Sequence, residues 1–168
     1  AQSVRDRVNA AHNQGTMGNE GVDQMTGSVK VDKTATLTIT PSFDANITIN
    51  RVGSDGNVLE AHTLDLTTGP STPLGIVNTI NGSSIPGVTA QINSDDQLEI
   101  NAPTTSITLN SGDVTIDGPQ NPGSEPRGFS HYFGLNNFFE TPKLTYDATD
   151  SKAVTNAAQD LRVRSDIA

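Results

Sequence analysis

Residues 28–40, SVKVDKTATLTIT, place an apolar side chain at almost every second position, and most of the polar positions between them hold threonine. Such alternation is typical of a strand that buries one face, and threonine suits the exposed face of a pleated sheet. We therefore predict one β-strand across this stretch, ended by Pro41, whose buried face is formed by Val29, Val31, Ala35, Leu37 and Ile39.

The same period-two pattern recurs outward from this stretch in pairs of short runs, each pair separated by turn-forming residues. Runs 47–49 and 58–66 flank GSDGN at 53–57, runs 88–92 and 98–100 flank NSDD at 93–96, and runs 107–109 and 114–116 flank NSGD at 110–113. Apolar alternation broken by Gly, Asn, Asp and Ser indicates β-hairpins. We therefore predict three antiparallel hairpins.

Between the first two hairpins the period changes to that of a helix. Ser71 or Thr72 can cap its start and Pro73 suits its first turn, while Leu74, Val77 and Ile80 share one face. We predict a short helix over 71–81 that packs on the following hairpin. The fold class expected is α+β, a β-rich domain of antiparallel hairpins with one short packed helix.

Both ends of the chain carry weak helical stripes. The N-terminal stripe holds Val4, Val8 and Ala11, and a C-terminal helix capped by Asp150 or Ser151 would align Val154, Ala157, Ala158 and Leu161. Neither stripe buries much alone, so we expect the two flanking helices to pair as part of a helical rod. The domain organisation expected is 1–27, N-terminal helix and exit loop; 28–127, β-rich domain; and 128–168, aromatic segment and C-terminal helix.

The composition excludes several classes of protein. The chain has 168 residues, a formal net charge of −9 and no cysteine. Without cysteine there is no disulfide scaffold, thiolate metal site or cysteine nucleophile. An acidic chain does not favour nucleic acid or an anionic membrane, and no apolar run approaches the length of a membrane span. We therefore expect neither a nucleic-acid nor a membrane partner.

The few aromatic residues are concentrated in one place. Residues 128–139, GFSHYFGLNNFF, hold four of the five Phe and one of the two Tyr. In a chain so poor in aromatic side chains, this aromatic segment should anchor the core or a domain junction.

Residues that could carry chemistry do not form a recognisable constellation. His12, His62 and His131 lack a second metal ligand at helical or strand spacing, and Asp55 lies in a Gly/Asn/Ser turn, as does the pair Asp95-Asp96. No nucleophile elbow, phosphate-binding loop or dinucleotide fingerprint occurs. We therefore expect no catalytic residue, no metal, no cofactor and no enzyme activity.

Three segments in order resemble the bacterial flagellar axial proteins, and most closely the hook-associated protein 1 family of the hook–filament junction. The aromatic segment looks like that family's FGLNDFF signature, with Asn137 where Asp is commoner. Residues 157–167, AAQDLRVRSDI, are similar to its LxVRxDI segment, and residues 8–15, VNAAHNQG, resemble the end of its N-terminal rod helix. Residues 71–102 also look like the IN motif that flagellins and hook proteins share, on the basis of Ile80-Asn81, residues 87–90 (GVTA) and residues 98–100 (LEI).

The resemblance implies a multi-domain structural protein, exported by the flagellar type III apparatus to the extracellular flagellum. Its partners would be hook protein, other hook-associated proteins and, in the full-length protein, an export chaperone. The family's polymerising outermost termini are not in this sequence, so the isolated piece is expected to be monomeric.

The function expected is therefore a non-catalytic adaptor between hook and filament. Two alternatives remain: a flagellin or another hook-associated protein, and a surface-exposed β-rich adhesin or binding module. The candidate contacts between domains or subunits are the apolar residues of the flanking helices and the aromatic segment, namely Val4, Val8, Phe129, Tyr132, Phe133, Leu135, Phe138, Phe139, Val154 and Leu161.

Overall fold

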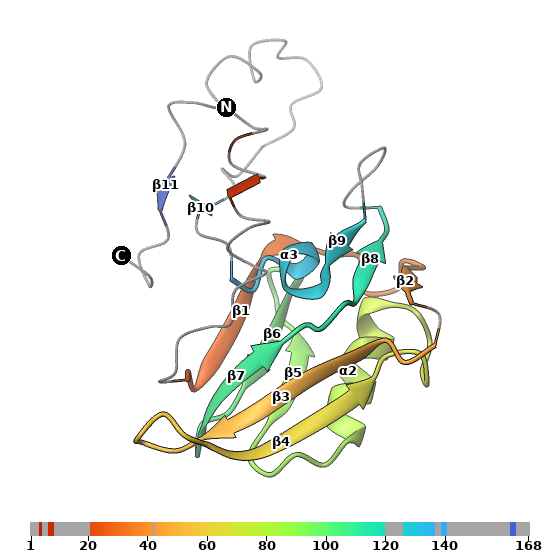
Figure 1. Cartoon of the computed structure of the whole chain (residues 1–168). Helices are drawn as coiled ribbons and strands as arrows, with labels where there is room; N and C mark the ends of the chain where they lie inside the picture. Colours follow the sequence, from red (N-terminus) through yellow and green to blue (C-terminus); the bar gives the residue numbers. More distant parts are fainter. Residues whose placement is uncertain are drawn as a thin grey trace.

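The computed structural model describes residues 21–41, 43–119 and 126–136, together with Val4, Arg7, Val8 and the backbone of residues 139–140 and 162–163. The described chain is β-rich and contains three three-stranded antiparallel sheets (Figure 1). Their strand orders are β4-β3-β7, β1-β6-β5 and β2-β8-β9. Two helices, α2 and α3, lie among these sheets. This arrangement is compatible with the expected α+β class and equally with a mostly β class.

The first sheet contains the hairpin of β3 (Asn46–Val52) and β4 (Val58–Asp65), as predicted, with β7 (Ser106–Asn110) on the other side of β3. Its buried face follows the alternation in the sequence, because Ile47, Ile49 and Leu64 are at most 3% exposed. The turn contains an Asx motif, in which Asp55 accepts hydrogen bonds from the backbone and side-chain amides of Asn57 at 3.1 and 2.7 Å. The interpretation of Asp55 as a turn residue is confirmed.

The second sheet contains the predicted hairpin of β5 (Thr89–Ile92) and β6 (Gln97–Asn101), with β1 (Gln24–Lys30) beside β6. Its turn forms because Asn93 Oδ1 accepts from the backbone N–H groups of Asp95 and Gln97, each at 3.0 Å. The expectation that residues 1–27 contain only an N-terminal helix and an exit loop was wrong at the end of this range. Strand β1 begins inside that range and buries Met25 to 2% exposure.

Helix α2 (Pro73–Gly82) begins where the capping residues predicted. Thr72 is the N-cap, and its hydroxyl accepts from the Gly75 N–H at 3.0 Å. The predicted apolar face was wrong at one position. Leu74 is 42% exposed, whereas Ile76, which the prediction left out, is 1% exposed. The neighbouring Val77 and Ile80 are buried as expected.

The prediction of one strand over 29–40 was wrong. Strand β1 ends at Lys30, and the chain then turns before β2 (Thr38–Thr40), which belongs to the third sheet with β8 (Thr115–Asp117) and β9 (Arg127–Gly128). The cause is Asp32, whose carboxylate accepts from the backbone N–H and the hydroxyl of Thr34 at 2.9 and 2.7 Å. This local turn competes with a continuous strand.

The third predicted hairpin was also wrong, although both of its strands exist. Strand β7 pairs with β3, and β8 pairs with β2 and β9. The other edge of β7 is already engaged, because Val22 and Ile107 exchange backbone hydrogen bonds of 2.9 and 2.8 Å. With both sides of β7 in use, the chain after Gly112 continues into another sheet.

The buried apolar side chains, apart from Val52, form one cluster drawn from all three sheets and from α2 and α3 (Phe129–Phe133). A two-residue strand pair, β10 (Phe139–Glu140) with β11 (Arg162–Val163), lies apart from these sheets (Figure 1). Within the described part of the chain, no helix has the length and apolar character needed to cross a membrane.

The flanking helices of the prediction fall almost wholly outside the described residues. Of the predicted N-terminal helix the structure describes Val4, Arg7 and Val8, which have helical backbone, and the rest of that helix lies outside the described residues. The predicted C-terminal helix, and with it the pairing of the two helices, lies outside the described part.

Candidate anchoring site

The aromatic segment begins with helix α3, whose limits are set by glycines. Gly128 precedes the helix, and Gly134 ends it with a φ of 68°, a left-handed conformation that favours glycine. After this turn the Leu135 N–H returns to the carbonyl of Ser130 at 2.9 Å. The GLN sequence that follows α3 is therefore a helix-ending turn.

Four side chains of this segment form what we call the aromatic anchor: Phe129, Tyr132, Phe133 and Leu135. The three rings are fully buried and Leu135 is 2% exposed. Phe133 contacts both other rings at centroid distances of 5.1 Å, tilted against Phe129 and edge-on to Tyr132. These are the arrangements that aromatic pairs prefer, and each such pair adds about 0.5–1.5 kcal/mol beyond area burial.

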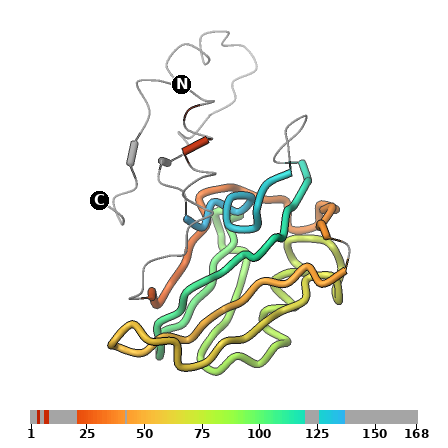
Figure 2. Tube along the Cα trace, in the orientation of Figure 1, coloured from red at the N-terminus to blue at the C-terminus, as the bar shows by residue number. Residues whose placement is uncertain are grey.

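The aromatic anchor is fastened to the strand by which the chain enters the sheets. The carbonyl of Gly134 accepts from the Ser28 N–H at 3.1 Å and from the Ser28 hydroxyl at 3.2 Å, across 106 residues of sequence. Figure 2 shows the orange trace of β1 running beside the blue trace of α3. Incoming strand and outgoing helix are therefore joined directly.

Gly27 allows this close approach. A Cβ atom at this position would collide with the carbonyl oxygen of Phe133. A glycine inside a strand often marks a place where another backbone passes close by. The sequence contained this signal, TGS within an apolar strand, but only the structure shows which segment passes there.

A second contact holds the aromatic anchor from the side of the third sheet. A Cβ atom at Gly118, just after β8, would lie 2.5 Å from the Tyr132 hydroxyl oxygen and 2.8 Å from Leu37 Cδ2. Ser130 is buried, and its hydroxyl lies 2.7 Å from that of Ser111 in the turn after β7. Helix α3 therefore touches β1 and the region around β8 at once.

The structure thus places the predicted contact residues in three groups. The four members of the aromatic anchor come together, and this chain itself covers them, so they fix the segment to the β-rich unit. Val4 and Val8 are 60% and 36% exposed on helical backbone. The side chains of Phe138, Phe139, Val154 and Leu161 lie outside the described residues. Sequence reasoning missed Gly27, Ser28, Gly118 and Ser130.

Asn81, in the segment that resembles the IN motif, has a defined structural role at the end of α2. The Asn81 Nδ2 group donates to the Ala90 carbonyl at 3.0 Å, and Asn81 Oδ1 accepts from the Ala90 N–H at 2.8 Å. The Asn81 side chain thus binds both the N–H and the C=O of Ala90, which point away from β6. It fastens α2 to β5 in the same way that a neighbouring strand would.

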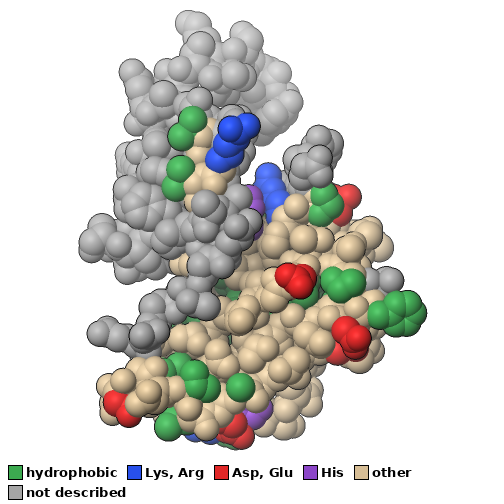
Figure 3. All heavy atoms as spheres, in the orientation of Figure 1, with side chains coloured by type: hydrophobic (Ala, Val, Ile, Leu, Met, Phe, Trp, Pro, Cys, Tyr) green, Lys and Arg blue, Asp and Glu red, His purple; other side chains and the backbone are tan. Residues whose placement is uncertain are grey.

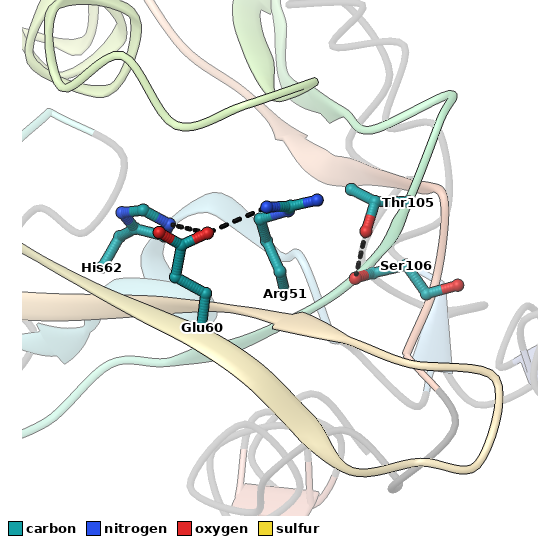
Figure 4. Close-up of polar contacts among 5 residues, drawn as sticks. All are labelled: Arg51, Glu60, His62, Thr105 and Ser106. Atoms are coloured by element: carbon teal, nitrogen blue, oxygen red, sulfur yellow. Dashed lines mark hydrogen bonds and ion pairs between the residues drawn. The ribbon is translucent and has the colours of Figure 1, made fainter.

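Charged groups are sparse on this unit, and their contacts are local. The Arg51 guanidinium donates to Glu60 Oε2 at 2.8 Å, and His62 Nε2 lies 3.2 Å from the same oxygen (Figure 4). The pKa of Glu60 is lowered first by the Arg51 hydrogen bond and then by His62. Glu60 is about half exposed, so this pair contributes little to stability.

The pKa values of carboxylates in turns are also lowered by donors that are close in sequence. The pKa of Asp65 lies below its ordinary value because the Thr67 hydroxyl, and then the Thr67 backbone N–H, donate to it.

Within the described ranges, no group of His, Cys, Asp or Glu side chains is arranged to hold a metal ion. The face drawn in Figure 3 is mostly uncharged, with acidic and apolar side chains scattered over it.

A scan of the chain against protein-family models and a search of the curated proteins each return no match.

Proposed function

We propose that this chain is part of a structural protein of the bacterial flagellum that joins the hook to the filament and performs no catalysis. The observation that carries the proposal is the junction of Ser28 with Gly134. The segments that resemble flagellar axial proteins flank or overlap this junction. A β-rich unit whose incoming and outgoing segments are fastened together suits insertion into a larger rod.

The aromatic anchor supports the same proposal, because it gives the most specific part of the resemblance a mechanical role. A junction between polymers of different stiffness transmits force through the chain connections of each outer unit. Three buried rings and two hydrogen bonds to one carbonyl stiffen that connection in this chain.

In this proposal the protein is extracellular and reaches the flagellum through the type III export apparatus. Its partners are hook protein and other hook-associated proteins, with an export chaperone before secretion. The contacts to these partners are made by the flanking segments, which include Val4, Val8, Val154 and Leu161. The aromatic anchor serves the attachment of the β-rich unit.

Immunogold electron microscopy tests the proposal on intact cells. Antibodies raised against residues 21–136 should label one narrow band where the hook meets the filament. Labelling along the whole filament would instead support a flagellin. Labelling of the cell surface away from flagella would support the adhesin alternative and overturn the flagellar proposal.

A further inference from the structure

Three of the six edges of these sheets, on β7, β5 and β1, are closed by other parts of the same chain. On β7, Val22 and Ile107 exchange two backbone hydrogen bonds. On β5, the Asn81 side chain occupies both polar groups of Ala90. On β1, the Ser28 N–H is taken by Gly134. Since an unpaired edge invites association, these contacts prevent unwanted pairing at three edges.

The outer edge of strand β4 differs from these three covered edges. Among the described residues, β3 is its single strand partner. Its first four residues, 58–61, are all exposed, and the aliphatic side chains of Val58 and Leu59 are 57% and 66% exposed. The strand forms the lower border of the first sheet in Figure 1. It is therefore a long edge with apolar side chains in solvent.

The register shows which backbone groups face outward from this edge. The Leu66 N–H donates to Ala45, directly beyond the pair formed by Asn46 and Asp65. In an antiparallel pair, hydrogen-bonded and non-hydrogen-bonded positions alternate. The N–H and C=O groups of Ala61 and Thr63 therefore point away from β3. They form a row that another strand can bind.

We propose that this edge pairs with β4 of a second copy of the chain, antiparallel and with the two-fold axis at Ala61. The two copies of the first sheet then become one continuous sheet. A two-fold contact of this kind uses the same surface on both subunits and closes as a dimer. The proposal is independent of the flagellar function, and it replaces the monomer expected from the sequence.

The complementary side chains of Glu60 and His62 favour a second copy and this register. With Ala61 opposite its own counterpart, Glu60 of each copy lies opposite His62 of the other, at a non-hydrogen-bonded position where side chains are closest. Arg51 already holds the Glu60 carboxylate at 2.8 Å. A register centred on His62 would place the two imidazoles opposite each other and leave Glu60 facing Leu64.

The local shape of the strand limits the contact to a short stretch. The register of β3 with β4 shifts between Arg51 and Val52, which leaves Leu59 as an extra residue. The regular edge therefore begins at Glu60, and the exposed Leu59 meets Thr63 of the second copy. A short stretch of pairing predicts a dimer whose population depends on concentration.

The first test changes the residue on the axis. Ala61→Lys places two ammonium groups opposite each other in the dimer, whereas Ala61 is exposed in the single chain. The matched control is Ser94→Lys, in the exposed turn between β5 and β6. Light scattering over a concentration series should show the mass of the control rising toward twice 17.6 kDa and A61K staying at one chain. A single-chain mass for both variants, or masses beyond a dimer, would overturn the proposal.

The second test uses the absence of cysteine. Ala61→Cys introduces one thiol, which in the proposed dimer lies about 5.5 Å, Cα to Cα, from its counterpart, within disulfide reach. Mild oxidation should convert A61C to a covalent dimer many times faster than S94C. Circular dichroism confirms that each variant is folded. Equal rates of cross-linking for the two variants would refute the proposed register.

Discussion

Asn81 and Ala90 are joined by two hydrogen bonds, from Asn81 Nδ2 to the Ala90 carbonyl and from the Ala90 N–H to Asn81 Oδ1. The amide side chain matches a backbone peptide group in its donor and acceptor, and can replace a missing strand at the edge of β5. A residue that the sequence singles out by its resemblance to a motif thus has a specific structural role. The junction of Ser28 with Gly134 fastens the opposite side of the same sheet.

We expect Asn81→Asp to destabilise the chain by about 1–3 kcal/mol at neutral pH, because a carboxylate cannot donate to the Ala90 carbonyl and leaves it unsatisfied. Urea unfolding would measure the change. Asn78→Asp is the matched control, since Asn78 is exposed on the same helix. Equal losses for the two variants would contradict the role assigned to Asn81.

We expect Gly27→Ala to destabilise the chain by about 1–3 kcal/mol, the usual effect of overpacking, because the new methyl group meets the Phe133 carbonyl oxygen. Gly82→Ala adds the same methyl group at the end of α2, where no atom lies within 4 Å. That control should be neutral or stabilised by up to about 1 kcal/mol. Thermal unfolding of the G27A and G82A variants measures the difference in stability. A G27A variant as stable as the original chain would show that α3 can move away from β1 without loss of stability.

Phe133→Ala should lower the free energy of unfolding by about 3–5 kcal/mol, since the ring is fully buried and contacts two others. Phe43→Ala makes the same chemical change at a ring that is 83% exposed, and should stay within about 0.5 kcal/mol of the original chain. Chemical denaturation of the two variants side by side measures the difference. Similar small losses would mean that the aromatic anchor does not hold the unit together.

The pKa of Glu99 lies below its ordinary value because Asn101 and then Gln91 donate to it, at 2.7 and 2.8 Å. The folded state therefore binds this proton less readily than the unfolded state. The resulting stability is present above the unfolded pKa of about 4.3 and is lost as the pH falls through the lower folded pKa. Asn101→Ala should raise the folded pKa toward its ordinary value.

An NMR titration of the Glu99 carboxyl carbon measures this shift directly. Asn110→Ala is the control, because the Asn110 side chain accepts from Gly112 and lies on a different sheet from Glu99. If both variants titrate like the original chain, the side-chain amides are not the cause of the lowered pKa.

Sequence patterns predicted the structure correctly wherever a single turn or a single helix cap determines the backbone conformation. The hairpins of β3 with β4 and of β5 with β6 are joined by short turns that contain Asp55 and Asn93, and both were predictable from alternation and turn residues. Helix α2 was predictable from Thr72 and Pro73. The sequence also indicated that residues 128–139 are an anchoring segment, because aromatic side chains are so scarce elsewhere.

The errors arose where two structures compete over a longer range. Asp32 favours a turn inside a run whose alternation fits a strand, and the turn forms because its carboxylate accepts two nearby donors. Leu74 fits the helical stripe by spacing, yet the packed face of α2 is rotated toward Ile76. Periodicity gives the shape of an apolar face but cannot tell which residues the neighbouring strands cover.

The sequence by itself determined the strand segments from β3 to β8, the tight turns, the helix start and the position of the aromatic residues. Each of these depends on interactions within about ten residues, which backbone sterics and hydrogen bonding settle locally. Tertiary structure alone decided that β7 leaves β8 for β3, that Gly27 makes room for Phe133, and that Ser28 is bound to Gly134. These pairings depend on which edge is free after the other strands have packed, a condition that no local pattern in the chain encodes.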